Sequence, residues 1–337
     1  MPLTNFPHGI TSFGIPQYGQ GFPLGVGAGQ VYYTVTSRSS TNYFYVQLIK
    51  NGIPGNRIFL TLAAAYAATT SGQNDVIVAT PGTYTETATT TWANSNTHLV
   101  GVAGPQSRGN MGNSVCFNTT TITLASVVEV TGDNCCFYNV QLRNAGANAA
   151  CLSALKVSDG ENFYAEGCHF VGHAAATQVG TANTCSLWLY TASTGKPWGA
   201  TFVNCKIGDA GERVRTDGYP IYISGTAGGT AKYVTFDNCV IEGWCETAAK
   251  PSVYFAANYC IDRYILFKDC FFFNYWVNQA DTQGEVIGNA CGTTFYCVLM
   301  GSTCNAGFTA WNTTGLAYIH ACGPAAGSAM GTAVAAT

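Results

Sequence analysis

Four stretches of this sequence share one pattern: FYAEGCHFVG (163–172), TFVNCKIGDA (201–210), VTFDNCVIEG (234–243) and ILFKDCFFFN (265–274). Each runs from an apolar residue through Asn, Asp or Gly to a cysteine and then to a further apolar residue. The aligned cysteines are Cys168, Cys205, Cys239 and Cys270, spaced by 37, 34 and 31 residues. An earlier copy, FYNVQLRN (137–144), carries Val140 in the cysteine position. A repeat of roughly 30 residues predicts a stack of similar structural units.

A second ladder lies between these copies, in the stretches ALKVS, SLWLY, PIYIS and SVYFA. Its first apolar positions are Leu155, Leu187, Ile221 and Val253, and EVIGN continues it at Val286. Two ladders with one period mean that each repeat contributes at least two short strands. Short alternating strands with Gly and Asn corners and no intervening helix predict coils stacked at the strand spacing. We therefore expect an all-β, right-handed parallel β-helix.

Fifteen cysteines are present, yet none forms a C-x-x-C pair. This spacing does not favour a zinc site or a thioredoxin-like motif. A disulfide scaffold is the alternative, but a chain of this length can bury a core without one. We predict a column of reduced, inward-facing cysteines, because free cysteine behaves as a small buried hydrophobe. The neighbouring Asn204, Asn238 and Asp269 are interpreted as turn residues.

The composition excludes several classes of protein. Charged residues make up 9% of the 337 residues, against about 25% in an average globular protein. A net charge of −3 provides no basic field, which argues against nucleic acid as the partner. No segment approaches the roughly 20 apolar residues of a membrane helix, and no secretory signal precedes the repeat. No cofactor or metal site is assigned.

The segment RIFLTLAAAYAATTSGQNDVIVATPGTYTET (57–87) resembles the opening of many right-handed β-helix proteins. In those proteins a short Ala-rich helix caps the tube before the first coil. The resemblance implies a capping helix over Ile58–Ala68, with Asn56 as its N-cap, and a strand over Asp75–Ala79. It also implies a turn over residues 81–84, and a second-coil strand beginning at His98.

Residues 1–30 do not fit the repeat and predict an extended arm, in which single aromatic residues alternate with Gly and Pro. Residues 5–16, NFPHGITSFGIP, resemble the N-termini of a family of tailed-bacteriophage structural proteins. In that family an arm precedes a β-helix, and the proteins sit on the virion, commonly as head decoration. The resemblance implies a capsid decoration or cement protein located on the virion, made in the host cytoplasm and attached through its arm. The expected contact residues are Asn5, Phe6, Phe13, Ile15, Tyr18 and Phe22.

The expected partner of the arm is the major capsid protein or another virion protein. We also expect a homotrimer, because exposed strand edges invite association and threefold closure suits an icosahedral lattice. A glycan is a further candidate ligand. The predicted organisation is an arm (1–30), a linker or first strands (31–56), the β-helix (57–322) and a low-complexity C-terminal tail (323–337).

An enzyme is the rival hypothesis, because β-helices also host polysaccharide-cleaving enzymes. The alternatives are a tailspike-like polysaccharide depolymerase and a glycan-binding adhesin. The densest charged stretch, IGDAGERVRTDGYP (207–220), holds Asp209, Glu212, Arg213, Arg215 and Asp217. We interpret it as a solvated loop with internal ion pairs rather than as an active site, and we assign no catalytic residue. His169 follows Cys168 directly and is expected to point outward, as a surface residue.

The stretch FFFNYW (271–276) is the most aromatic run of the sequence. Strand alternation places Phe271 and Phe273 on one side and Phe272 on the other. At least one ring is therefore expected to face outward, against a neighbouring subunit or against a sugar.

Overall fold

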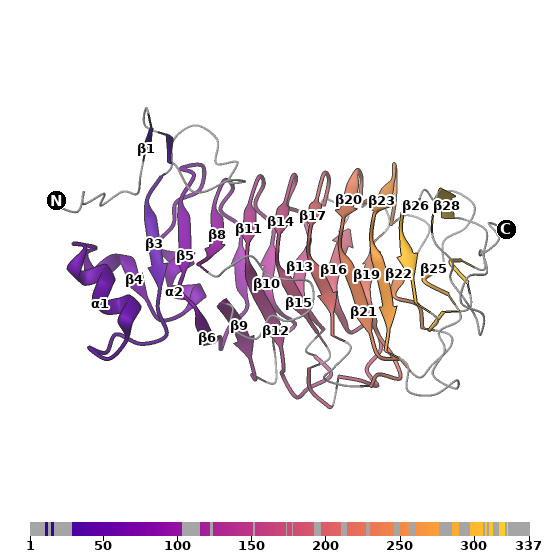
Figure 1. Cartoon of the computed structure of the whole chain (residues 1–337), viewed down its shortest axis with the longest axis horizontal. Coiled ribbons are helices and arrows are strands. Elements are labelled where there is room, and N and C mark those ends of the chain that lie inside the picture. Colours follow the sequence, from indigo (N-terminus) through magenta and orange to yellow (C-terminus); the bar gives the residue numbers. More distant parts are fainter. Residues whose placement is uncertain are drawn as a thin grey trace.

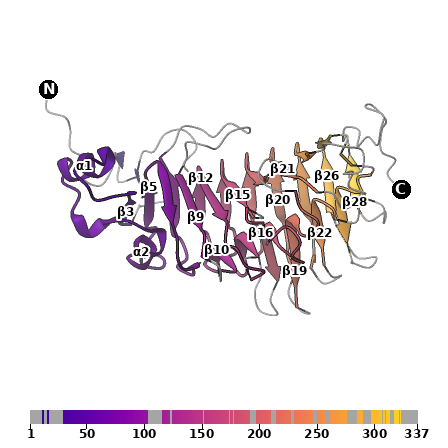
Figure 2. The ribbon, with the colours of Figure 1, turned by 90° about the horizontal axis from the view of Figure 1, so that it is seen from below.

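The computed structural model describes residues 11–12, 15–16, 29–102, 115–121, 124–150, 152–172, 174–176, 178–191, 197–209, 214–226, 230–245, 250–256, 260–275, 285–289, 297–305, 307–308, 310–312, 317–320 and 322. Within these residues the chain forms a right-handed parallel β-helix, as the repeat predicts. Figures 1 and 2 show its strands stacked side by side along the long axis, with the helices at the N-terminal end.

Three parallel sheets form the walls of the tube. The 11-stranded sheet contains β3 (Val31–Thr34), β4 (Ile58–Phe59), β5 (Val76–Ala79), β8 (His98–Gly101), β11 (Cys136–Tyr138), β14 (Tyr164–Glu166), β17 (Thr201–Val203), β20 (Val234–Asp237), β23 (Ile265–Lys268), β26 (Cys297–Met300) and β28 (Ala317–His320). The 8-stranded sheet contains β6 (Gly82–Thr85), β9 (Val115–Thr119), β12 (Val140–Asn144), β15 (His169–Val171), β18 (Lys206–Gly208), β21 (Val240–Gly243), β24 (Phe271–Asn274) and β27 (Thr303–Cys304). The 7-stranded sheet contains β7 (Thr90–Trp92), β10 (Ser126–Val130), β13 (Ser153–Val157), β16 (Cys185–Thr191), β19 (Tyr219–Gly225), β22 (Val253–Phe255) and β25 (Ile287–Asn289).

Each coil passes through the 7-stranded, 11-stranded and 8-stranded sheets in turn, and the register confirms both ladders. In the first ladder Gln141 pairs with His169, so the residues directly before them, Val140 and Cys168, occupy equivalent positions. In the second ladder Leu155, Leu187, Ile221 and Val253 pair in sequence. The expected fifth member was wrong by one residue, because Val253 pairs with Ile287 and not with Val286. The alternating pattern of EVIGN allowed either register, since Val286 is also buried.

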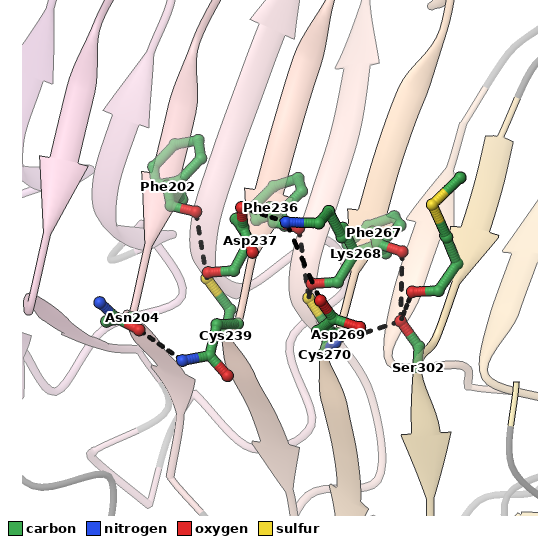
Figure 3. A network of polar contacts seen from close by, with 12 residues as sticks. Phe202, Asn204, Phe236, Asp237, Cys239, Phe267, Lys268, Asp269, Cys270 and Ser302 are labelled. Atoms are coloured by element: carbon green, nitrogen blue, oxygen red, sulfur yellow. Dashed lines mark hydrogen bonds and ion pairs between the residues drawn. The ribbon is translucent and has the colours of Figure 1, made fainter.

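A single residue in the left-handed conformation makes the bend between the 11-stranded and 8-stranded sheets. Asn204, Asn238 and Asp269 have φ values of 51°, 55° and 52°, which confirms them as turn residues. Asn and Asp adopt this conformation more readily than other non-glycine residues. The side-chain amide of Asn238 also donates a hydrogen bond to Oδ1 of Asn204, at 2.5 Å (Figure 3). Gly167 and Gly301 occupy the same column, with φ values of 62° and 63°.

The residue after each bend points into the tube and forms the cysteine column. Cys168, Cys205, Cys239 and Cys270 are at most 1% exposed. Each thiol donates to a carbonyl of the preceding coil, for example from Cys239 to Phe202 at 3.3 Å and from Cys270 to Phe236 at 3.4 Å (Figure 3). Ser302 extends the column and donates to the Phe267 carbonyl at 3.1 Å.

The four column cysteines Cys168, Cys205, Cys239 and Cys270 are free thiols in this structure. Burial raises the pKa of Cys205 and Cys270. The thiolates of these two residues, which redox or metal chemistry would need, are therefore disfavoured at neutral pH.

Aromatic side chains fill much of the tube next to this column. Phe202, Phe236 and Phe267 are fully buried at equivalent positions of β17, β20 and β23. Their rings stack with centroids 4.8 and 4.7 Å apart and with interplanar angles of 8° and 7°. Offset-stacked rings at this separation add stabilisation beyond the burial of their area. One continuous core therefore runs along the described coils.

The N-terminal end of the tube is covered by helix α2 (Leu62–Ala67). Its N-cap is Thr61, whose hydroxyl accepts from the amide of Ala64 at 3.2 Å. The buried carboxylate of Glu86 accepts from the amide of Leu62 at 2.8 Å, which satisfies a further free donor of the helix. A capping helix is thus present, but the predicted range of Ile58–Ala68 with Asn56 as the cap was wrong. Ile58 and Phe59 form β4 instead, because they pair with Tyr33 and Thr34 of β3.

Two further details differ from the expectations for this end. Residues 82–85 form strand β6 rather than a turn, because they pair with β9 of the next coil. The segment 31–56 contains both the strand β3 and a helix, α1 (Tyr43–Lys50), which is capped by Asn42. A 3-10 turn (Gly55–Arg57) leads from α1 into β4. The strand His98–Gly101 is present as expected.

Little of the arm falls within the described residues. β1 (Thr11–Ser12) and β2 (Ile15–Pro16) pair in antiparallel fashion. Of the six expected contact residues, Ile15 lies in β2, whereas Asn5, Phe6, Phe13, Tyr18 and Phe22 lie outside the described residues, as does the tail 323–337. Among the helices that the structure describes, none combines the length and the hydropathy needed to cross a membrane.

The left-handed bends lead to a stability prediction. Asn238→Ala should lower the free energy of unfolding by about 1–2 kcal/mol, because alanine gains nothing that offsets the left-handed conformation. Asn238→Gly should cost less, since Gly167 and Gly301 already serve in the same column. Urea denaturation of the two variants measures the difference. Equal losses for Ala and Gly would show that the amide ladder, and not the backbone conformation, carries the effect.

Candidate functional site

The outer face of the 7-stranded sheet carries a column of large polar and aromatic side chains. Strand pairing aligns Glu129, Lys156, Trp188, Tyr222 and Tyr254 on five successive coils. Their sequence neighbours on either side, such as Leu187 and Leu189, are fully buried in the core. Alternation along each strand therefore forces these five side chains to the outside. We call these five residues, together with Tyr190 and Tyr219, the aromatic column.

The rings of the aromatic column are in contact with one another. Tyr222 and Tyr254 are almost parallel, with an interplanar angle of 2° and centroids 6.3 Å apart. Tyr219 stacks on Tyr254 at 4.6 Å and on Tyr222 at 5.4 Å. Trp188 lies 6.1 Å from Tyr222, and its indole N–H donates to the hydroxyl of Ser224 at 2.8 Å. These contacts fix the rings before any ligand or partner arrives, which lowers the entropy cost of binding.

Charged groups border the rings at both ends. Nζ of Lys156 lies 2.8 Å from Glu129 and also stands over the rings of Trp188 and Tyr190, at 4.9 and 4.6 Å. At the other end Lys250 pairs with Asp217 at 2.7 Å and stands 5.7 Å from the centre of the Tyr219 ring. Cation–π contacts of this kind hold a lysine against an aromatic surface. The site therefore combines ring faces with fixed donors and acceptors.

This arrangement suits binding better than bond cleavage. Glycoside hydrolysis ordinarily requires two carboxyl groups roughly 5–9.5 Å apart. Glu129 is the single carboxylate of the aromatic column, and it already accepts from Lys156 and from the Ser158 hydroxyl at 2.8 Å. Elsewhere in the described part of the chain, no group of three His, Cys, Asp or Glu residues is arranged to hold a metal ion. Tyr219 and Tyr222 are only 5% and 7% exposed, so Trp188, Tyr190 and Tyr254 are the rings of the column that can stack against a sugar or a partner protein.

The charged stretch 207–220 is not the solvated loop that was expected. Arg215 is only 2% exposed, its Nη1 donates to the Gly218 carbonyl, and its Nε and Nη2 are buried without a hydrogen-bond partner. Burial lowers its pKa. The side chain fits because residue 243 is glycine, where an added Cβ would lie 3.2 Å from Nη2. Asp217 pairs with Lys250, outside the stretch, while Glu212 and Arg213 lie outside the described residues.

His169 points away from the core as predicted, but it is 3% exposed and is not a surface residue. Nε2 donates to the Gly208 carbonyl at 2.9 Å, so Nδ1 accepts from the amide of Gln141 at 3.1 Å. Burial, aided by the charge of Lys206, lowers the pKa of His169 to about 3. The imidazole is therefore neutral at physiological pH and fully engaged in hydrogen bonds.

The alternation predicted for Phe271, Phe272 and Phe273 is confirmed. Phe272 is fully buried, whereas Phe271 and Phe273 are partly exposed on the outer face of the 8-stranded sheet, with ring centroids 6.0 Å apart. Tyr275 continues this outer cluster and is 42% exposed. What these rings contact beyond the chain stays a prediction.

The aromatic column was missed at the level of sequence, although its signal was present. In SLWLY, PIYIS and SVYFA an aromatic residue follows each aligned apolar position, at Trp188, Tyr222 and Tyr254. Because the buried position was aligned first, the next residue along each strand is the one that faces outward. The same alignment therefore already contained the outer column.

The fold places this chain among the right-handed parallel β-helix proteins. Escherichia coli ybhc covers 93% of this chain and 82% of its own length, with 12% identity and a TM-score of 0.50. A pectin methylesterase mutant in complex with a hexasaccharide has 15% identity over 83% of this chain and 80% of its own, with a TM-score of 0.49. Pectate lyase Pel9A has 16% identity over 83% and 64%, with a TM-score of 0.49.

No family model matches the sequence, and no curated protein is similar to it. At these identities the similarity concerns the fold alone. The activities of the pectin enzymes are therefore not transferred to this chain.

The burial of the rings predicts an alkaline effect on stability. Burial raises the pKa of Tyr222 to about 12, so the folded state keeps a proton that the unfolded state releases near pH 10. The stabilisation is complete below pH 10 and is lost as the pH rises toward 12. Thermal unfolding between pH 9 and 12 should therefore show a smaller decline for Tyr222→Phe than for the unchanged protein. The 68%-exposed Tyr43 supplies the control, because Tyr43→Phe should leave the decline unchanged.

Proposed function

We propose that this chain is a non-enzymatic structural protein of a tailed-bacteriophage virion, a capsid decoration or cement protein attached through its N-terminal arm. The observation that carries the proposal is the sequence NFPHGITSFGIP at residues 5–16, followed by a parallel β-helix. This is the order of arm and coil found in the phage family that the arm resembles. In such a protein the arm would attach the chain to the particle, and the rigid tube would project from the particle surface.

The use of charge in the described coils supports a structural role. Charged side chains pair between neighbouring coils: Lys156 with Glu129 at 2.8 Å, Lys206 with Glu242 at 2.7 Å, and Lys268 with Asp237 at 2.9 Å. Each of these pairs joins adjacent strands of one sheet. The six groups of these pairs are thereby committed to the stack, where they favour one register over its alternatives.

In this proposal the arm binds the major capsid protein or another virion protein, through Asn5, Phe6, Phe13, Ile15, Tyr18 and Phe22. An arm almost without charge can bury its aromatic rings against an apolar groove or add a strand to an exposed sheet edge. A homotrimer would multiply the weak contact of each arm, because linked sites bind at high effective concentration. The outer aromatic rings at Phe271 and Phe273 are the proposed contact between subunits.

Substitutions in the arm test this proposal. Phe6→Ala combined with Phe13→Ala should reduce binding to particles that lack this chain by at least about tenfold, because two buried rings are lost. Co-sedimentation with such particles measures the loss, and circular dichroism should show an unchanged β-helix. Pro23→Ala, outside the motif, is the matched control. Full binding by the double variant would mean that the coils and not the arm make the attachment.

A glycan-binding adhesin is the second candidate function, and the aromatic column favours it. Its stacked rings and bordering Lys156 and Glu129 provide the combination of apolar faces and polar groups that sugars require. Trp188→Ala and Tyr254→Ala should each weaken binding to polysaccharide from the host surface by about tenfold. Tyr43→Ala should have no effect. If new reducing ends accumulated with the unchanged protein, the depolymerase alternative would replace both candidates.

A further inference from the structure

A small cleft lies away from the aromatic column, at the turn that leads from the 7-stranded sheet into the 11-stranded sheet. It has a volume of about 310 Å³ and is lined by Tyr233, Asp262, Arg263 and Tyr264. Tyr233 directly precedes β20, and the other three residues directly precede β23 on the next coil. The turns are fixed to each other by hydrogen bonds from Asp262 N to Ala231 O at 3.1 Å and from Val234 N to Tyr264 O at 3.3 Å. The walls of the cleft are therefore held in place.

Tyr233 occupies an unfavourable backbone conformation in this cleft. Its φ of 57° is left-handed, and the equivalent residues of earlier coils are Asn134, Asn162 and Gly199, which tolerate that conformation. A bulky side chain is strained there. Because Tyr233 is 47% exposed, burial in the core does not compensate for the strain. A strained, exposed ring beside a cleft points to a role in binding.

The lining presents ring faces, a donor fork and an acceptor within one small volume. The rings of Tyr233 and Tyr264 meet edge to face at 5.5 Å, and Tyr264 is 38% exposed. Nη1 of Arg263 lies 3.0 Å from the Asp262 carboxylate, and the arginine side chain remains 56% exposed. Arg263 also interacts with the Tyr233 side chain, and Asp262 also binds Lys232. A guanidinium has five N–H donors and a carboxylate about four lone-pair positions, so some donors and acceptors still remain for a ligand.

Charges of both signs meet at the cleft. Lys232 binds Asp262 at 2.6 Å from outside the lining and stands over the Trp198 ring at 4.2 Å. The Asp262 carboxylate is thus shared by Lys232 and Arg263, which gives these described residues one more positive than negative charge. A sugar, with adjacent hydroxyl groups and an apolar ring face, can engage all four lining residues.

We propose that this cleft binds a pyranose unit of a glycan. One ring face of the sugar packs against Tyr233 or Tyr264, while adjacent hydroxyl groups accept from Arg263 and donate to Asp262. The proposal rests on neither the arm nor the aromatic column, so it stands or falls independently of the proposed function.

Saturation-transfer NMR on the full chain tests the proposal with methyl glucoside, methyl galactoside, methyl mannoside and N-acetylglucosamine as probes. At least one should bind with a dissociation constant of roughly 1–10 mM, as expected for a small ligand in an open site. Tyr264→Asn and Tyr233→Asn should each weaken that binding by at least about tenfold through loss of the ring. Tyr43→Asn, which changes a 68%-exposed tyrosine of α1, is the matched control and should leave the binding unchanged.

The two tyrosine variants should differ in stability. Tyr233→Asn relieves the left-handed strain, so its melting temperature should rise by roughly 1–3 °C, whereas Tyr264→Asn should give no rise. Binding lost in both variants together with a higher melting temperature in Tyr233→Asn alone supports the proposal. Absence of binding by all four sugars, or retained binding in Tyr264→Asn, would overturn it.

Discussion

One left-handed residue at each bend between the 11-stranded and 8-stranded sheets sets the geometry on which the rest of this structure depends. Where the chain turns through a single residue, the next side chain must enter the tube. The column of Cys168, Cys205, Cys239 and Cys270 is the consequence, and each thiol donates to a carbonyl of the coil before it. Small side chains are needed because the neighbouring Phe202, Phe236 and Phe267 fill the remaining space. Backbone conformation, side-chain size and register are therefore linked.

The outer surface follows from the same register. Strand alternation turns every second residue outward, and parallel pairing stacks the outward residues of successive coils. The aromatic column and the ion pairs between coils are both products of this stacking. The two features differ in how much of each side chain remains free to contact another molecule. Ion pairs satisfy their members within the stack, whereas ring faces at half-buried positions can still contact a partner.

The right-handed parallel β-helix fold does not by itself decide the activity of this chain. A parallel β-helix supplies a rigid support, and function depends on the side chains that the support carries. Here the charged groups of the outer faces largely pair between coils, and the exposed features are aromatic.

The repeat alone determined the fold class, both ladders, the turn residues and the burial of the cysteines. A parallel stack imposes one period on every column, and that period is visible in the sequence. The N-terminal end of the tube was less predictable. The strand β4 forms only because it pairs with β3, and β3 lies more than 20 residues earlier in the chain. Tertiary structure alone decided the burial of Arg215 and His169. The space left by Gly243 and the acceptor at the Gly208 carbonyl come from other coils. The cleft at Tyr233 likewise needs two turns from neighbouring coils. A sequence pattern specifies which way a strand residue points, but what covers it is decided by loops of variable length that follow no period.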